Sequence, residues 1–157
     1  MDAQYTNAQG KDITMNTINL KDLSLNNYPF KTHDKIRYRD TDRQGHVNNS
    51  IFSTFIETGR IELLYNPKNG FLNDSTYVIA RLEMDFIDEI KWPGNIDIGT
   101  AVIHVGNSSM RLAQGLYQNG KLVATAESVI VQVDDLTKKS KILTDTQKEL
   151  LAKQLIQ

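Results

Sequence analysis

Residues 38–60 read YRDTDRQGHVNNSIFSTFIETGR, and this stretch decides the predicted fold. Its first part is polar and contains Gly45, which is typical of a turn. Its second part is apolar at helical spacing and predicts a helix from about Asn49 to Asn66, because Asn48 or Asn49 can cap the start and Pro67 ends it. The apolar side of this helix carries Ile51, Phe52, Phe55, Ile56, Gly59 and Leu63.

The segments on both sides of this stretch are expected to form β-strands, because apolar and polar residues alternate in them. The Asn119-Gly120 dipeptide predicts a two-residue hairpin between the last two strands. The predicted strands are residues 33–39, 78–86, 96–105, 110–117 and 122–133. Since the helix must be covered on its apolar side, the order of elements predicts an α+β fold in which a five-stranded antiparallel meander curls around the helix.

The two ends of the chain differ in character. Residues 1–27 are polar and lack a sustained period, so we interpret them as a mobile tail and residues 28–157 as the folded domain. The alternative is that Leu20 to Leu25 docks on the sheet. At the other end, a short amphipathic helix follows Thr144, with two possible capping boxes, Thr144 with Gln147 and Thr146 with Glu149.

Composition excludes several classes of function. Of the 157 residues, 39% are hydrophobic and 24% are charged, which suits one globular domain, and the net charge of −1 attracts neither nucleic acid nor an anionic membrane. The absence of cysteine excludes disulfides, a thiolate nucleophile and a cysteine-ligated metal. No secretory signal and no membrane-spanning run are recognisable, so the cytoplasm is the expected compartment.

The stretch quoted above resembles the motif of hotdog-fold acyl-CoA thioesterases, the 4-hydroxybenzoyl-CoA-thioesterase-like superfamily. In that motif an Asp-x-Asp turn, here Asp40 and Asp42, precedes Gly-His-Val-Asn-Asn at residues 45–49 and the central helix. The resemblance extends to Tyr28-Pro29-Phe30 and Trp92-Pro93-Gly94. It implies a hotdog fold, with a five-stranded antiparallel sheet wrapped around a long central helix.

The resemblance implies a catalytic site at the start of that helix. Asp42 would act as general base or as nucleophile on the thioester carbonyl. His46 is a second catalytic candidate, although shaping the turn is its plainer role. Free backbone N–H groups at the helix N-terminus would hold the oxyanion. The residues expected to bind the oxyanion or substrate are Gly45, Val47, Asn48, Asn49 and Phe52.

Other residues have plainer alternatives. Without the resemblance, Asp40 and Asp42 are ordinary turn residues. They also imitate the start of a calcium loop, but Ile51 stands where such a loop needs Glu, so calcium is rejected, and the implied reaction needs no metal or cofactor. Glu57 and Arg60 are expected to form a surface ion pair, with a subunit contact as the alternative.

The expected ligand is an acyl-CoA. Ser109 and Arg111 are weak candidates for contacts with CoA. Many relatives carry Tyr at the positions of Phe52 and Phe55, so the acyl pocket is expected to be more apolar here. The resemblance also implies a homodimer or homotetramer with the site at the subunit interface. Two rival functions are a hydroxyacyl-thioester dehydratase, whose His-Phe-Pro-Gly signature is missing, and a non-catalytic acyl-CoA-binding module.

Overall fold

The structure is a computed structural model that describes residues 18–71 and 75–157. Five strands and two α-helices are found in these ranges, together with four short 3-10 turns. In chain order the elements are η1 (Leu20–Asp22), η2 (Leu25–Asn27), β1 (Phe30–Lys35), η3 (Tyr38–Asp40), α1 (Asn49–Tyr65), η4 (Pro67–Asn69), β2 (Thr76–Phe86), β3 (Asn95–Val105), β4 (Ser109–Gln118), β5 (Lys121–Val133) and α2 (Asp145–Ala152).

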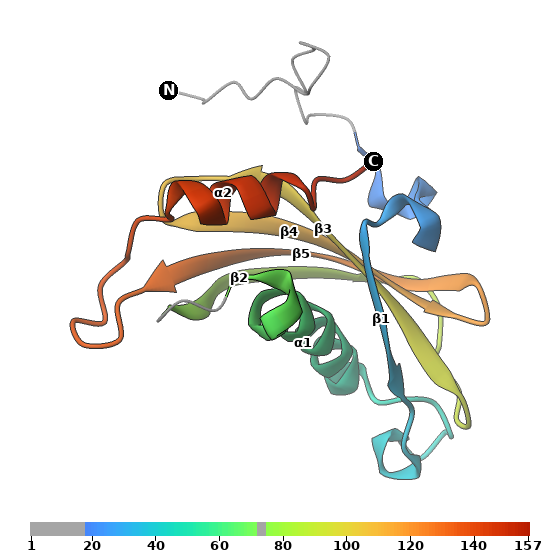
Figure 1. Cartoon of the computed structure of the whole chain (residues 1–157). Coiled ribbons are helices and arrows are strands. Elements are labelled where there is room, and N and C mark those ends of the chain that lie inside the picture. The colour runs from blue at the N-terminus through green and yellow to red at the C-terminus, as the bar shows by residue number, and fades with distance from the viewer. Residues whose placement is uncertain (1–17, 72–74) are drawn as a thin grey trace.

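The five strands form one antiparallel sheet that curves around α1 (Figure 1). This confirms the predicted α+β fold with a central helix. The predicted meander, however, is wrong, because the strand order is β1-β3-β4-β5-β2. The helix α1 carries the chain from one edge of the sheet to the other, so β1 and β2 lie at opposite edges although they are consecutive strands.

The apolar side of α1 packs on the concave face of the sheet. Phe52, Phe55 and Ile56 are buried together with Ile98 of β3 and Leu116 of β4. The side-chain amide of Gln114 also donates to the Ile56 carbonyl at 2.9 Å, which ties the middle of the helix to β4. Asn48 caps the helix by accepting from the Ser50 N–H at 3.0 Å, which satisfies one of the free N–H groups of the first turn.

Several predicted boundaries need correction. The first strand runs from Phe30 to Lys35 rather than from residue 33 to 39, because its partner β3 begins at Asn95, opposite Lys35. The Asn119-Gly120 hairpin is confirmed, and both residues have positive φ, 52° and 78°, as a type I′ turn requires. Of the two capping boxes, Thr144 with Gln147 is formed, whereas Thr146 lies inside the first turn of α2 and cannot cap it.

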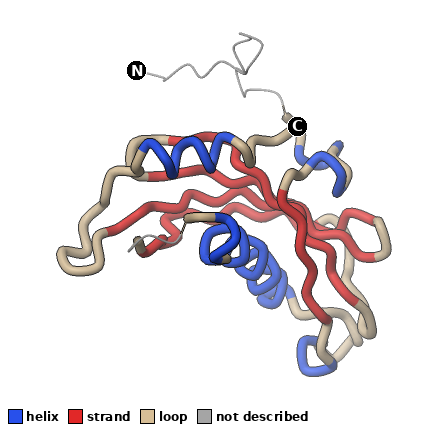
Figure 2. The backbone as a smooth tube through the Cα atoms, in the orientation of Figure 1, coloured by secondary structure: helices blue, strands red, loops and turns tan. Residues whose placement is uncertain are grey.

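Residues 18–27 differ from the predicted tail, because they pack on the face of the sheet opposite α1. Leu23 and Leu25 pack in an apolar cluster with Tyr28 and Tyr117, and the Tyr117 hydroxyl donates to the Leu23 carbonyl at 2.7 Å. Figure 2 shows these turns beside the C-terminus of the chain. The rest of the predicted tail, residues 1–17, lies outside the described residues.

Tyr28 explains why this segment can lie so close to the sheet. Gly99 and Gly115 face each other across β3 and β4, and their neighbours Ile98 and Leu116 point toward α1. A Cβ atom on Gly99 would lie 2.5 Å from the Tyr28 ring. The absence of side chains at the paired glycines therefore leaves room on the sheet for the Tyr28 side chain. We call residues 18–28 the N-terminal strap.

Candidate active site

The polar stretch before α1 is a tight, hydrogen-bonded loop. The Asp42 N–H donates to the His46 carbonyl at 2.7 Å, and the Gly45 N–H donates to the Asp42 carbonyl at 3.1 Å. Thr41 and Val47 form a bridge on either side of this turn. The Val47 N–H in turn donates to the Ile90 carbonyl at 2.8 Å, so the loop is held against the segment that follows β2.

The Asp42 carboxylate is exposed and faces this loop. Its Oδ1 accepts from the Gln44 N–H at 2.8 Å and from the His46 N–H at 3.2 Å. Its Oδ2 accepts no hydrogen bond from the described residues, and Asp42 has no ion pair among them. One oxygen therefore shapes the turn, and the other is available for chemistry.

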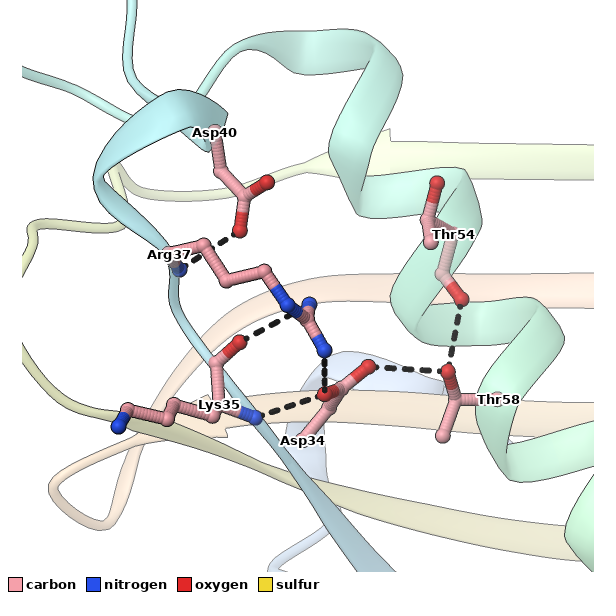
Figure 3. Close-up of polar contacts among 6 residues, drawn as sticks. All are labelled: Asp34, Lys35, Arg37, Asp40, Thr54 and Thr58. Atoms are coloured by element: carbon pink, nitrogen blue, oxygen red, sulfur yellow. Dashed lines mark hydrogen bonds and ion pairs between the residues drawn. The ribbon is translucent and has the colours of Figure 1, made fainter.

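Asp40 has a different environment, although it stands in the same motif. It is buried, and its Oδ2 accepts from the Arg37 N–H at 2.7 Å. Figure 3 shows this contact together with two contacts of Asp34. Asp34 accepts from the Thr58 hydroxyl of α1 at 3.0 Å and from the Arg37 guanidinium at 3.3 Å. These contacts join β1, the Asp-x-Asp turn and α1, so Asp40 has a structural role.

A pocket of about 390 Å³ lies between this loop, the start of α1 and the end of β2. It brings together five of the predicted site residues, namely Asp42, His46, Val47, Asn49 and Phe52. The lining residues that the sequence analysis missed are Gln44, Phe86, Ile87, Asp88 and Glu89. Phe52 and Phe86 form an edge-to-face pair with centroids 5.1 Å apart, so one wall of the pocket is aromatic.

The polar wall of the pocket contains paired charges. Nε2 of His46 lies 2.6 Å from Oε2 of Glu89, and the Lys91 ammonium lies 2.9 Å from the other oxygen of Glu89. The hydrogen bond with Glu89 raises the pKa of Lys91. A hydrogen bond from Lys121 lowers the pKa of the neighbouring Asp88 carboxyl. Unlike these carboxylates, Asp42 has no cation beside it among the described residues.

The predicted backbone donors are mostly engaged. The N–H groups of His46, Val47 and Asn48 donate to Asp42, to Ile90 and to the Asp40 carbonyl, respectively. Only the Asn49 N–H, at the first residue of α1, donates to none of the described groups. Of residues 46–49, Asn49 is therefore the one whose N–H can face a ligand at the positive end of the helix dipole.

Some predicted residues lie away from this pocket. Ser109 stands opposite Val131, whereas the pocket lies at the other end of the sheet, near Phe86. Arg111 forms an ion pair with Glu127 at 2.7 Å. Gly45 takes part in the turn and Asn48 caps α1, but neither lines the pocket. Phe55 is fully buried in the core.

The Glu57–Arg60 pair is present on α1, with 3.7 Å between the guanidinium and the carboxylate. Glu57 is exposed and does not line the pocket. The predicted ion pair is thus formed, but it is not a surface pair as expected, because Arg60 is buried and only Glu57 is exposed.

A second hollow in the structure is lined by none of the predicted site residues. A larger hollow of about 690 Å³ lies between the N-terminal strap and the sheet, bordered by residues 18–21, 83–85 and 125–127. In the described part of the chain no helix is long and apolar enough to cross a membrane, and no group of three or more His, Asp or Glu side chains could hold a metal ion.

Comparisons with known proteins show the family and the fold of the chain. The sequence model of the Thioesterase-like superfamily matches residues 36–151. A thioesterase from Thermus thermophilus, solved with coenzyme A and Zn, is 25% identical, with 80% of this chain and 93% of that chain covered and a TM-score of 0.70. A predicted thioesterase from Bacillus stearothermophilus is 26% identical, with 82% and 97% covered and a TM-score of 0.72.

A protein from Pseudomonas aeruginosa is similar in fold, with 21% identity, 85% and 96% coverage and a TM-score of 0.75. No curated protein sequence matches the chain significantly.

Proposed function

Since the chain belongs to the Thioesterase-like superfamily and has the hotdog fold, we propose that it hydrolyses an acyl-CoA thioester to the free carboxylate and CoA. The observation that carries this proposal is the arrangement at the start of α1. There an exposed carboxylate with one unengaged oxygen, that of Asp42, lines the same pocket as Asn49, whose N–H is unengaged among the described residues.

Asp42 would supply the nucleophile, either directly or through water. As a general base, its Oδ2 takes a proton from water, whose oxygen attacks the thioester carbonyl. As a nucleophile, Oδ2 attacks the carbonyl itself and gives a mixed anhydride that water then hydrolyses. In both routes the C–S bond breaks, CoA leaves as its thiol or thiolate, and Asp42 is regenerated. Neither route requires a metal or a cofactor.

The oxyanion would be held by the Asn49 N–H. This group lies at the N-terminus of α1, where the helix dipole favours negative charge. An oxyanion donor that acts in the transition state contributes roughly 10²–10³-fold to kcat in other acyl-transfer enzymes. The other candidate donors, at residues 46–48, support the loop through their own hydrogen bonds instead.

The acyl group is proposed to be uncharged and apolar. Phe52 and Phe86 present ring atoms to the pocket, and neither supplies a hydroxyl. On the polar wall, the Asp42 carboxylate has no cation beside it among the described residues and would repel an acyl chain that ends in a carboxylate. Straight aliphatic and aromatic acyl groups fit this chemistry, and dicarboxylic acyl groups do not.

The site is proposed to be completed by a second copy of the chain. The edge strand β2 exposes Val78, Ile79, Leu82 and Phe86. Val78 and Ser109 both stand opposite Val131, so Ser109 lies at the same end of the sheet as the start of β2, whereas Phe86 is at the end of β2. If two copies pair antiparallel along β2, the start of β2 in one copy lies beside the end of β2 in the other. Ser109 of one copy then lies toward the Phe86 end of the other. This arrangement would let Ser109 and Arg111 contact the CoA bound in the other copy's pocket.

The experiment that tests the function is a thiol-release assay over a panel of acyl-CoAs, with aliphatic, aromatic and dicarboxylic acyl groups. Thiol release with the apolar members and none with the dicarboxylic ones is expected. A conjugated enoyl product without released thiol would identify a dehydratase. Saturable binding of acyl-CoA without any turnover would identify a binding module. The location of the protein in the cytoplasm stays a prediction.

A further inference from the structure

We propose that Glu89 is a positioning residue, which holds the imidazole of His46 in one orientation and one protonation pattern beside Asp42. The inference rests on the proposed function, since the reaction at Asp42 is what the imidazole would assist. Its structural basis is the 2.6 Å contact between Oε2 of Glu89 and Nε2 of His46, at the wall of the pocket that Asp42 also lines.

The backbones that carry the two side chains are fixed to each other. The Val47 N–H donates to the Ile90 carbonyl at 2.8 Å, and His46 forms a bridge with Lys91. Ile90 is fully buried in the core cluster that contains Phe52 and Val47. The residues on either side of Ile90 are therefore held at the loop, so the contact between Glu89 and His46 does not depend on two freely moving surface segments.

The Glu89 carboxylate is oriented at both of its oxygens. The Lys91 ammonium lies 2.9 Å from Oε1, which leaves Oε2 to face His46. The contact of Oε1 with Lys91 thus orients the carboxylate so that Oε2 faces His46. An ordinary exposed ion pair has one contact between two mobile side chains and contributes little. Here three side chains and two backbone contacts define one geometry.

This geometry determines what the imidazole can do. A carboxylate only accepts hydrogen bonds, so Nε2 of His46 must carry a proton toward Glu89. In the neutral ring, Nδ1 is then the acceptor nitrogen. The His46 backbone N–H donates to Oδ1 of Asp42 at 3.2 Å, so the ring is attached at the residue that also holds the Asp42 carboxylate. In the proposed arrangement, Nδ1 is the ring nitrogen left to accept a proton in the pocket that Asp42 also lines.

The charged groups around His46 are consistent with a positioned ring. Asp42 and Glu89 are the carboxylates in contact with His46, one through its backbone and one through its ring. Asp88 also lines the pocket but is paired with Lys121. Lys91 is paired with Glu89. Among the described side chains that line the pocket, His46 is thus the one with a ring nitrogen that can accept a proton, since its other ring nitrogen donates to Glu89.

A double-mutant cycle on the full-length protein tests the inference. Glu89→Ala should lower kcat by about 10-fold with KM changed less than about threefold, because misplaced catalytic groups cost rate rather than binding. Glu89→Gln keeps an acceptor oxygen for Nε2–H and should restore most of the activity. In a His46→Ala background, Glu89→Ala should have no further effect. Glu149→Gln, which removes an exposed carboxylate of α2 outside the pocket, is the matched control and should keep wild-type kcat.

The ring proton gives a readout that does not need turnover. A nitrogen-edited NMR spectrum should contain a slowly exchanging Nε2–H signal for His46, assigned by its loss in His46→Ala. That signal should disappear in Glu89→Ala and remain in Glu149→Gln. If no acyl-CoA is hydrolysed by the wild type, the proposed function fails, and this signal still decides whether Glu89 holds His46. A signal or a kcat that is unchanged in Glu89→Ala, or effects of the two substitutions that add independently, would overturn the inference.

Discussion

Asp40 and Asp42 stand two residues apart in the same turn, yet their carboxylates have different surroundings. Asp40 is buried and accepts the Arg37 N–H, whereas Asp42 is exposed and keeps one oxygen unengaged among the described residues. The sequence predicts that a carboxylate from this turn lies at the start of the helix. The family resemblance singles out Asp42 of the two, and the structure adds the hydrogen bonds by which their surroundings differ.

Tyr28 provides a test of the packing under the N-terminal strap. Its hydroxyl is buried and has no hydrogen-bond partner among the described residues, and burial raises the pKa of its phenol. A buried polar group without a partner costs roughly 1–3 kcal/mol. Tyr28→Phe should therefore unfold at the same temperature as wild type at pH 7, or at a higher one, in a circular dichroism melt.

The raised pKa of Tyr28 also predicts how the stability of the Tyr28→Phe variant depends on pH. Because the folded state keeps the phenol protonated, its contribution to stability is full below the ordinary tyrosine pKa of about 10 and declines as the pH rises above it. Tyr28→Phe should lose less stability than wild type between pH 7 and pH 10.5. Tyr117→Phe is the control, since it removes the bond to the Leu23 carbonyl and should melt lower at pH 7. A Tyr28→Phe protein that melts lower than Tyr117→Phe would contradict this packing.

Among the elements, those with a strong local pattern are predicted best from the sequence. The periodicity of residues 49–66 predicts α1 to within one residue, and Asn119-Gly120 predicts the last hairpin. Strand order is not predictable in this way, because alternation tells which face of a strand is buried and not which strand lies beside it. The boundaries of β1 were missed for a similar reason, since they depend on where its partner β3 begins.

The same limit applies to the candidate site. His46 stands in a recognisable motif, whereas Glu89 and Phe86 follow a strand far along the chain and belong to no motif. They join the pocket because β2 ends beside the loop and the Ile90 carbonyl accepts from Val47. A lone Glu or Phe at the end of a predicted strand carries no signal that could have identified it.

The N-terminal strap makes a prediction at the scale of an element. It crosses the sheet from Tyr28 on β3 and β4 to Lys21, which forms an ion pair with Asp85 of β2 at 2.9 Å. Deletion of residues 1–27 should lower the melting temperature by about 5 °C or more, because Leu23 and Leu25 lose their apolar contacts. Deletion of residues 1–17 leaves these contacts in place and is the control. Equal melting temperatures for the two deletions would favour the original interpretation of residues 1–27 as a tail.

The whole molecule presents an apolar edge that a monomer would leave in water. Only β5 pairs with β2 among the described residues, and the free edge of β2 carries Ile79 and Leu82, both more than a third exposed. Light scattering at micromolar concentration should give at least twice the 17.8 kDa mass of the chain. Leu82→Lys should shift the protein toward the monomer and lower thiol release with it.

The matched control for this experiment is Ile142→Lys. Ile142 is 71% exposed and lies between β5 and α2, where the N–H of the next residue, Leu143, donates to the Asn107 carbonyl just before β4. The substitution adds the same charge without touching β2, so the oligomer and the activity should both be kept. A wild-type mass of one chain, or a Leu82→Lys protein with an unchanged mass, would exclude β2 as the contact between subunits.

The proposed role of Asp42 is tested by measuring thiol release by Asp42→Asn from the acyl-CoA that wild type hydrolyses fastest. The asparagine side-chain oxygen can still accept from the Gln44 and His46 N–H groups, so the loop should keep its shape, whereas Asp42→Ala would also lose those bonds. We expect Asp42→Asn to lose at least about 10²-fold in kcat with an unchanged circular dichroism spectrum and melting temperature. Activity within threefold of wild type in a folded Asp42→Asn protein would contradict the proposed role.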